Sequence, residues 1–459
     1  MTEDKIAAIS TPPGEGGIAI VRLSGKGVIE LVKNRFQPFK AEVDLANKQG
    51  FTLTLGWILN KYGEKIDEVL VSIMRGPHSY TGEDVVEINC HGGNLPARRC
   101  LETLLGDDLR LAQPGEFTRR AFLNGRLDMS QAEAVIDIIR SKTEQGMKLA
   151  VKQLEGGIKR YIANLENLLI RANALIEASL DFPEEVGDLD YEVVQGIIND
   201  VLAILDKLIA SGERNEVYRE GISVVICGKP NVGKSSLLNV LVKKERAIVT
   251  DIPGTTRDVI EDFINIRGIP VKLMDTAGIR ETQDLIEQIG VKKSQQAITE
   301  ADVIIFLLDA AAGITGEDED VYAQVKDRNP IILVNKEDLK EKKITALELE
   351  AKFPGLDIIR GSVQEETGLD ELENLIEERV FSGKVHHDDL EIMINLRQKN
   401  CLLKAREHVL NAQHYLTEVT LDCLGVDIWG ALESLGEISG KNLKEDVIDR
   451  IFHDFCIGK

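Results

Sequence analysis

The chain contains a phosphate-binding loop in the sequence context that such a loop requires. Residues 228–235 read Gly-Lys-Pro-Asn-Val-Gly-Lys-Ser, which fits the pattern G-x-x-x-x-G-K-[ST]. An apolar run at 222–227 precedes the loop and an apolar-rich stretch follows it, so we expect strand, loop and helix in that order. The backbone N–H groups of this loop and the helix N-terminus form a fixed anion site. Lys234 is placed to reach the β- and γ-phosphates of a nucleotide, and the Ser235 hydroxyl to ligate Mg2+.

Two further motifs close apolar runs and select the nucleotide. Asp275-Thr-Ala-Gly278 follows the run 269–274, where the acid can hold Mg2+ through water and the glycine N–H can face a γ-phosphate. Asn335-Lys336-Glu337-Asp338 follows the run 331–334. The Asp338 carboxylate can accept both N–H groups on the amidine edge of guanine, an edge that adenine does not offer. The three motifs in this order predict a guanine-nucleotide-binding domain.

The composition is that of an ordinary globular protein of two or three domains. The chain has 459 residues, 43% of them apolar and 29% charged. It has neither an apolar run of about 20 residues nor a basic and apolar leader, so we expect a cytoplasmic protein that does not enter a membrane. Its six cysteines include no C-x-x-C pair, which weighs against a zinc ribbon or a disulfide framework.

The net charge of −22 weighs against a protein that binds RNA through bulk electrostatics. An RNA contact therefore needs a local basic patch, and the candidates are Arg98-Arg99, Arg119-Arg120 and Lys243-Lys244 with Arg246. For each candidate, a solvated charge pair on a helix is the favoured interpretation.

Periodicity divides the chain into four segments. The first has short β-like runs and a helical stretch near 95–106, which favours an α/β domain. Helical periodicity fills the second and fourth segments, and the phosphate loop lies in the third. The simplest arrangement is a discontinuous α-helical domain into which a Ras-like α/β G domain is inserted. The expected boundaries are 1–118, 119–215, 216–384 and 385–459.

Apolar stripes define the long helices of the second segment. Ser130-Gln-Ala-Glu133 fits a capping box and predicts a helix start. One stripe runs from Leu154 to Ile176 at three- and four-residue steps and predicts one long helix. A second stripe runs from Val193 to Leu208, and we expect its helix to end near Gly212.

The residue after the motif Asp275-Thr-Ala-Gly278 is Ile279, where many small GTPases carry a glutamine that orients the attacking water. The chain therefore either binds nucleotide with negligible turnover or orients the water with other groups. Glu281, Asp284 and Glu287 are candidate acids, and the residues alone do not decide among them.

The stretch 250–258 is a second candidate for contact with the phosphates. It reads Thr-Asp-Ile-Pro-Gly-Thr-Thr-Arg-Asp, and its proline and glycine suit a loop with an unusual backbone course. Thr256 offers a hydroxyl for Mg2+. A ring of carbonyl oxygens from this loop suits a monovalent cation, and Asn231 in the phosphate loop can add an amide oxygen to that ring.

Further motifs extend the signature to both ends of the chain. Asn231 in the phosphate loop, Gly254-Thr-Thr-Arg-Asp258, Asp275-Thr-Ala-Gly-Ile-Arg280 and the terminal Phe455-Cys-Ile-Gly-Lys459 resemble the MnmE (TrmE) family of tRNA-modification GTPases. The resemblance covers essentially the whole chain. In the N-terminal segment it rests on Thr11–Gly17, Ser79–Asp84, His91–Gly93, Pro114–Phe117 and Ala121–Asn124.

The resemblance implies a K+-stimulated GTPase whose turnover depends on dimerisation. It implies K+ ligands at Asn231, Thr250, Ile252 and Thr255, and Mg2+ ligands at Ser235 and Thr256. Among the candidate acids, the resemblance implies that Glu287 is the catalytic one and acts on the attacking water through a second water. The expected contacts with GTP are Asn231, Val232, Gly233, Lys234, Ser235, Ser236, Thr250, Asp251, Ile252, Pro253, Gly254, Thr255, Thr256, Asp275, Thr276, Ala277, Gly278, Asn335, Lys336, Asp338 and Ser362.

The resemblance also implies that the N-terminal segment is a folate-binding, dimerising domain for 5-formyl- or methylene-tetrahydrofolate. The implied contacts are Arg22, Glu87, Arg126 and Lys459. Arginine suits the glutamate carboxylate of folate, and a glutamate suits the N–H donors of a pterin. The family often has lysine where this chain has Arg126, which keeps the charge and changes the contact geometry.

As function, the resemblance implies that a homodimer works with an FAD-dependent partner, MnmG (GidA), in a heterotetramer or larger complex. Together they form the (carboxymethyl)aminomethyl group at C5 of the wobble uridine of certain tRNAs, using the tetrahydrofolate one-carbon unit. GTP hydrolysis drives the G domains together and apart. The rival hypotheses are a GTP-dependent ribosome assembly factor, which binds RNA without modifying it, and a nucleotide-switch scaffold.

Two residues keep alternative interpretations. In the guanine loop, Gly361-Ser362-Val363 has valine where GTPases usually carry alanine. The backbone N–H that contacts guanine O6 can be kept with valine, or the larger side chain can change that contact. Cys456 is either a thiol activated by Lys459 or a small packed residue near the folate pocket.

Overall fold

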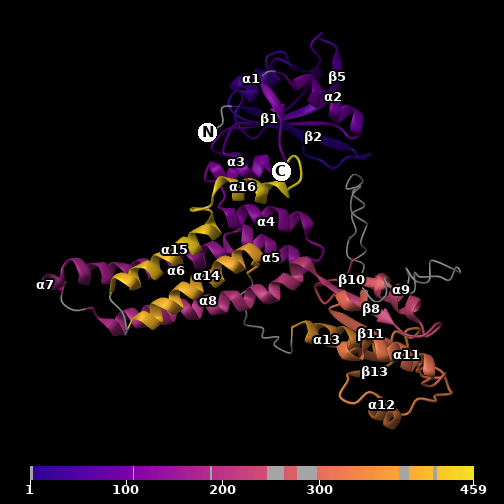
Figure 1. Cartoon of the computed structure of the whole chain (residues 1–459). Coiled ribbons are helices and arrows are strands. Elements are labelled where there is room, and N and C mark those ends of the chain that lie inside the picture. Colours follow the sequence, from indigo (N-terminus) through magenta and orange to yellow (C-terminus); the bar gives the residue numbers. More distant parts are fainter. Residues whose placement is uncertain are drawn as a thin grey trace.

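The protein forms an N-terminal α/β body, a helical body and a second α/β body, arranged as in Figure 1. The C-terminal end of the chain lies beside the N-terminal body. No described helix is both long and apolar enough to cross a bilayer. The computed structural model describes residues 4–106, 108–186, 189–244, 263–275, 297–381, 392–416 and 421–459.

The N-terminal body is built on a seven-stranded sheet of order β3-β4-β5-β6-β2-β1-β7. Neighbouring strands are antiparallel except β1 and β7. The β-like runs and the helix near 95–106 are confirmed. The elements are β1 (Lys5–Ile9), β2 (Ile18–Ser24), α1 (Val28–Lys33), β3 (Phe36–Pro38), the 3-10 helix η1 (Leu45–Asn47), β4 (Thr52–Leu59), β5 (Lys65–Met74), β6 (Val85–His91), α2 (Asn94–Leu104) and β7 (Leu109–Leu111).

The two faces of this sheet differ in what covers them. Side chains that alternate along the central strands, such as Val71 and Ile88, are buried with the apolar residues of α1 and α2. On the opposite side, Leu53 and Leu55 of β4 and Leu70 of β5 are 60%, 41% and 39% exposed. Leu55 lies directly across from Leu70. This side of the sheet therefore carries an exposed apolar patch, defined by these three leucines.

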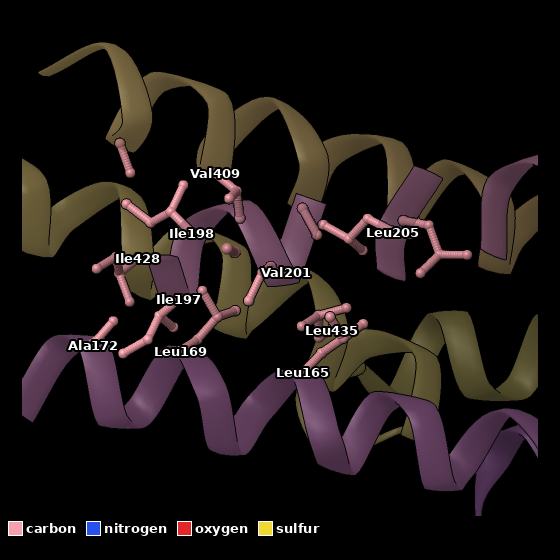
Figure 2. Packing of buried hydrophobic residues seen from close by; sticks show 14 of the residues in the cluster. Leu165, Leu169, Ala172, Ile197, Ile198, Val201, Leu205, Val409, Ile428 and Leu435 are labelled. Atoms are coloured by element: carbon pink, nitrogen blue, oxygen red, sulfur yellow. The ribbon is translucent and has the colours of Figure 1, made fainter. Parts of the chain in front are cut away.

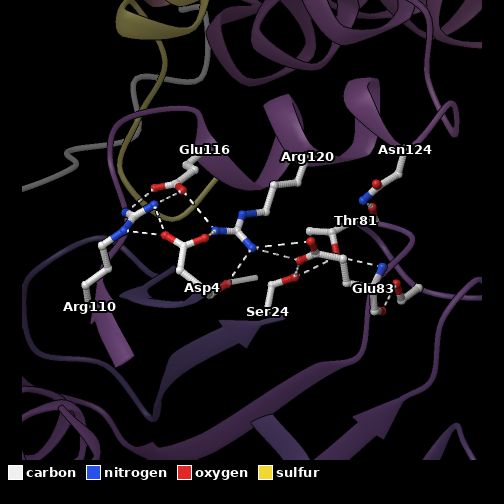
Figure 3. A network of polar contacts seen from close by, with 9 residues as sticks. Asp4, Ser24, Thr81, Glu83, Arg110, Glu116, Arg120 and Asn124 are labelled. Carbon is white, nitrogen blue, oxygen red and sulfur yellow. Dashed lines mark hydrogen bonds and ion pairs between the residues drawn. The ribbon is translucent and has the colours of Figure 1, made fainter. Parts of the chain in front are cut away.

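A buried network of ion pairs joins α3 (Glu116–Leu123) to the N-terminal body (Figure 3). Arg120 is 2% exposed and pairs with Asp4 at 2.9 Å, Glu83 at 3.1 Å and Glu116 at 3.2 Å. Arg110 pairs with the same Asp4 and Glu116. Arg120 is thus a structural residue, so the prediction of a solvated charge pair was wrong, and it belongs to no RNA-binding surface.

The N-cap of helix α4 (Met129–Arg140) lies two residues before Ser130, where the predicted capping box begins. The N-cap is Asp128, whose carboxylate accepts the Gln131 N–H at 2.9 Å, while the Gln131 side chain accepts the Asp128 N–H at 3.1 Å. Ser130 donates its hydroxyl to Asp128 at 2.7 Å. The prediction based on Ser130 was wrong because a better acceptor lies two residues upstream.

The helical body combines segments from both sides of the G domain, which confirms the predicted discontinuous helical domain. Leu165, Leu169 and Ala172 of α6 pack against Ile197, Val201 and Leu205 of α8, and helices α14 and α15 complete the core with Val409, Ile428 and Leu435 (Figure 2). The helices are α5 (Glu144–Leu154), α6 (Gly157–Asp181), α7 (Pro183–Val186), α8 (Tyr191–Glu220), α14 (Leu396–Tyr415), α15 (Leu421–Ser439) and α16 (Glu445–His453).

Glycines correct two of the predicted helix limits. The first stripe lies on two helices, because Gly156 adopts φ 88° and separates α5 from α6. Helix α8 continues past Gly212 and ends at Gly221, which has φ 86°. A Cβ on Gly212 would lie 3.1 Å from the Cβ of Ile394, so this glycine permits close packing within a helix rather than ending it.

The G domain has a six-stranded sheet of order β13-β12-β11-β8-β10-β9. All neighbours are parallel except β9 and β10, and every residue of β11 is buried, as expected of a sheet covered on both faces. The elements are β8 (Ile222–Cys227), α9 (Lys234–Lys244), β9 (Phe263–Ile266), β10 (Ile269–Asp275), β11 (Val303–Asp309), α11 (Gly316–Val325), the 3-10 helix η2 (Lys326–Arg328), β12 (Ile331–Asn335), α12 (Ala346–Lys352), β13 (Ile358–Arg360) and α13 (Leu369–Val380).

Candidate nucleotide and folate sites

The phosphate loop connects β8 to α9, as the sequence predicts. Asn231 and Gly233 have positive φ values of 62° and 108°. A Cβ on Gly233 would lie 2.4 Å from the Asn335 amide nitrogen, so only glycine fits there. The Lys234 ammonium donates to the carbonyls of Gly228 at 2.7 Å and Lys229 at 2.8 Å. The lysine assigned to the phosphates thus lies against its own loop.

The side-chain amide of Asn335 joins the phosphate loop to the guanine loops. Asn335 ends β12 and is 3% exposed. Its amide nitrogen donates to the Val232 carbonyl at 2.8 Å, and its oxygen accepts the N–H groups of Lys336 at 2.8 Å and Val363 at 2.9 Å. This residue therefore fixes three loops at the carboxyl ends of parallel strands, where α/β sheets bind ligands.

Lys336 makes a second connection between the same loops. Its ammonium donates to the carbonyl of Asn231 at 2.9 Å and to the carboxylate of Asp309 at 2.6 Å. Burial opposes ionisation of Asp309, but the hydrogen bonds from Lys336 and from the backbone N–H groups of Ala311 and Ala312 lower its pKa. The sequence analysis missed Asp309, although an acid that closes the apolar run 303–308 was visible.

The predicted base contacts lie on two loops at this edge. Asp338 is exposed, three residues beyond the end of β12. Ser362 is 1% exposed, and its N–H donates to the Thr367 hydroxyl at 2.9 Å. Val363 is 3% exposed and packs in the apolar core of the G domain. The additional bulk of valine is therefore absorbed by the core.

Several predicted residues lie outside the described residues, so their placement stays a prediction. The backbone of Asp275 is described as the last residue of β10. Those outside the described residues are Thr250, Asp251, Ile252, Pro253, Gly254, Thr255, Thr256, Thr276, Ala277, Gly278 and Glu287, together with Ile279, Glu281 and Asp284.

The C-terminal residues dock into the N-terminal body. The Gly458 carbonyl accepts hydrogen bonds from Arg22 at 3.0 Å and from the Ser10 hydroxyl at 3.1 Å. Gly458 has φ 91°, and a Cβ there would lie 2.7 Å from the Ile9 carbonyl. The Lys459 carbonyl accepts the N–H of Phe117 at 3.2 Å. The last residues of the chain thus form one wall of a site on the N-terminal body.

Two of the four residues assigned to folate, Arg22 and Arg126, lie against Tyr80, and the other two, Glu87 and Lys459, lie near Arg22. Arg22 and Glu87 lie opposite each other on β2 and β6 and form an ion pair of 2.8 Å. The guanidinium groups of Arg22 and Arg126 lie 5.4 and 5.0 Å from the centre of the Tyr80 ring. Tyr80 and Phe117 were not singled out, although they lie in motifs that carried the family resemblance.

The charge of this site suits an anion. Burial, and next the positive charge of Arg22, lower the pKa of the Lys459 ammonium. Arg126 is exposed at the rim, and Glu87 is the acidic member of the group. The residues present therefore fit a ligand with a carboxylate tail and N–H donors, as folate has.

Comparisons with known proteins cover the chain from end to end. The family model "MnmE helical domain" matches residues 129–456, and the model "GTP-binding protein TrmE N-terminus" matches residues 5–126. The tRNA modification GTPase MnmE of Syntrophomonas wolfei subsp. wolfei is 64% identical over 100% of both chains. The protein of the same name from Carboxydothermus hydrogenoformans is 48% identical, also over 100% of both.

The similarities to solved structures cover only part of the chain, and one of them is to Era. Era in complex with MgGDPNP and nucleotides 1506–1542 of 16S ribosomal RNA is 32% identical and covers 41% of this chain and 66% of that one. The TM-score is 0.29, too low to carry an argument.

Proposed function

The chain belongs to the MnmE family of tRNA modification GTPases, and from this premise we propose that it is a K+-stimulated enzyme acting on the wobble uridine of certain tRNAs. With an FAD-dependent partner, MnmG (GidA), it forms the (carboxymethyl)aminomethyl group at C5 of that base. The one-carbon unit comes from 5-formyl- or methylene-tetrahydrofolate. The reaction takes place in the cytoplasm, where tRNA is available.

The GTPase step uses residues of the phosphate loop, residues between 250 and 256, and Glu287. Ser235 and Thr256 hold Mg2+, and Asn231, Thr250, Ile252 and Thr255 hold K+. When bound, these ions supply positive charge where negative charge develops in phosphoryl transfer. Support for Asn231 comes from its exposed side chain and from Lys336, which binds its carbonyl and so fixes its backbone. Glu287 orients the attacking water through a second water, a role left open by Ile279.

The N-terminal site binds the folate, and the exposed leucines of the sheet support a homodimer. Arg22, Arg126 and Lys459 are cations that suit the carboxylates of folate, and Glu87 suits the pterin. The patch of Leu53, Leu55 and Leu70 is apolar and exposed, as expected of a surface that a second copy covers. Hydrolysis moves the G domains, and the helical body transmits this motion to the partner complex.

One observation carries this proposal: the C-terminal Gly458 and Lys459 complete a cationic site on the N-terminal body of a chain that is also a GTPase. A ribosome assembly factor, the rival hypothesis, has no need of such a site. Titration of the full-length protein with 5-formyltetrahydrofolate separates the two: we expect saturable binding that Arg22→Ala weakens, whereas absence of binding favours the rival.

The tRNA reaction is tested by mass spectrometry of tRNA nucleosides from a strain that lacks the chain. We expect loss of the C5 substituent at the wobble uridine and its return with the wild-type gene. The Lys234→Ala variant, which disables the phosphate loop, should not restore it. An unchanged nucleoside profile in the deletion strain contradicts the proposal.

A further inference from the structure

Lys229, the second residue of the phosphate loop, has a side chain that no part of the mechanism uses. Its ammonium lies 2.7 Å from the carboxylate of Asp318, 3.2 Å from the Thr315 hydroxyl and 3.3 Å from the Gly313 carbonyl. These acceptors come from the segment that leads into α11. The Lys229 side chain is 11% exposed and that of Asp318 is fully buried. The phosphate loop is therefore connected to α11 by a buried ion pair.

Asp318 depends on this lysine for its charge balance. Its carboxylate also accepts the N–H of Thr315 at 2.9 Å and the hydroxyl of Thr315 at 2.8 Å, which closes the N-terminus of α11. Its second oxygen has no hydrogen-bond partner among the described residues. A carboxylate removed from water needs a cation nearby, and in the described part of the chain Lys229 is the cation that contacts it.

The backbone of Lys229 touches the residue that receives the phosphates. Its carbonyl accepts the Lys234 ammonium at 2.8 Å. The other end of the same connecting segment holds the middle of the loop, because Asp309 binds Lys336, which in turn binds the Asn231 carbonyl. Residues 309–318 therefore hold the phosphate loop at two points, through Asp318 at its start and through Asp309 at its middle.

We propose that Lys229 and Asp318 are positioning residues for the phosphate loop: their buried ion pair holds its first turn in the arrangement that receives the nucleotide. A cradle of backbone N–H groups binds a phosphate well only when the groups are already aligned, because aligning them on binding costs affinity. The β-phosphate is common to GDP and GTP, so loss of the ion pair should weaken the binding of both nucleotides by the same factor. Neither Lys229 nor Asp318 is among the residues assigned to hydrolysis, so turnover at saturating GTP should change less than affinity.

The test uses the full-length protein with Lys229→Met, Lys229→Arg and Asp318→Asn. Dissociation constants are measured for GDP and for a non-hydrolysable GTP analogue, with kcat and KM for GTP and the melting temperature without nucleotide. For Lys229→Met we expect both dissociation constants to rise about tenfold or more in equal proportion, with kcat within about threefold. Lys229→Arg, which keeps the charge, should return them to within about threefold of the wild type. The double variant Lys229→Met with Asp318→Asn should bind no worse than the weaker single variant.

Two controls separate positioning from simple stability. Glu319→Gln breaks the exposed ion pair between Glu319, the neighbour of Asp318 on α11, and Lys352 of α12, and it should change neither affinity nor melting temperature. Thr345→Val removes the hydroxyl that caps α12 by accepting the Glu348 N–H, away from the Lys229–Asp318 pair, so it should lower the melting temperature and keep GDP affinity near that of the wild type. If Lys229→Met does not fold, the dissociation constants of Asp318→Asn are compared with those of the wild type, because asparagine has nearly the same shape as aspartate.

The proposal rests on GTPase activity and not on the K+, folate or tRNA proposals, because GDP affinity is measured without them. A folded Lys229→Met protein with wild-type affinity for GDP overturns it. So does a loss of affinity that Thr345→Val reproduces at the same loss of melting temperature, since the role would then be structural only.

Discussion

The nucleotide site and the proposed folate site of this chain are assembled in different ways. At the nucleotide site, loops at the ends of neighbouring parallel strands meet, and Asn335 joins them within one sheet. At the folate site, Arg22 of β2 binds Gly458, a residue 436 positions away. The first site follows from the topology of one domain. The second site forms only when the C-terminal residues pack against the N-terminal body.

The helical body connects the two sites. Helix α8 leads into β8 of the G domain, and α14, α15 and α16 lead from the G domain to the docked C-terminus. Where α8 ends, Gly221 packs so closely on the Pro270 carbonyl that a Cβ would lie 2.3 Å from it. The proposed movement of the G domain would therefore act on the helical body that leads to the docked C-terminal residues at the proposed folate site.

The largest expected effect confined to one of the two sites is the loss of GTP hydrolysis on substitution of Glu287. We expect Glu287→Ala to bind GTP and folate as the wild type does and to hydrolyse GTP about a hundredfold more slowly, because the water loses its orienting acid. Glu281→Ala is the matched control and should hydrolyse GTP normally. Single-turnover kinetics and nucleotide titration measure both. If Glu287→Ala keeps its hydrolysis rate, the role belongs to another residue.

A substitution that displaces Gly458 should weaken folate binding without affecting the nucleotide site. Gly458→Ala forces a Cβ into the Ile9 carbonyl at a backbone angle that L residues avoid, so we expect folate affinity to fall about tenfold or more. GDP affinity should not change. Ile457→Ala, at a neighbouring side chain that is 62% exposed, serves as the control. Calorimetric titration with 5-formyltetrahydrofolate reports the outcome, and equal affinities for the two variants would show that the docked end does not shape the site.

A smaller expected effect is that folate affinity depends on pH and GDP affinity does not. The pKa of Lys459 is lowered in the free protein by burial and by Arg22, and a bound carboxylate would raise it again. Folate affinity should therefore fall a few-fold as the pH rises through the lowered pKa, with proton uptake on binding, while GDP affinity stays constant. The lowered pKa has the opposite effect on folding: stability rises with pH from the lowered value up to the ordinary value of 10.5. A Lys459→Gln variant that shows the same pH dependence would contradict this assignment.

The sequence predicted the elements and the domain arrangement, and it missed single side-chain contacts between distant segments. Strands, helices and the phosphate loop follow from periodicity and motifs in contiguous residues, and the discontinuous helical domain follows from helical periodicity on both sides of the G domain. Gly212 misled the prediction because a glycine that ends a helix and one that permits close packing look alike in sequence. Asp309 and Asp318 were missed because their roles depend on lysines that only the fold brings near.

The central claim is that a cation site at Asn231 supplies positive charge that speeds GTP hydrolysis. It is tested most directly by the kcat for GTP hydrolysis in KCl and in NaCl at equal ionic strength, for the wild type and for Asn231→Ala. The account predicts that the wild type turns over about tenfold faster or more in K+ and that Asn231→Ala loses the difference. Equal kcat values for the wild type in the two salts would contradict it.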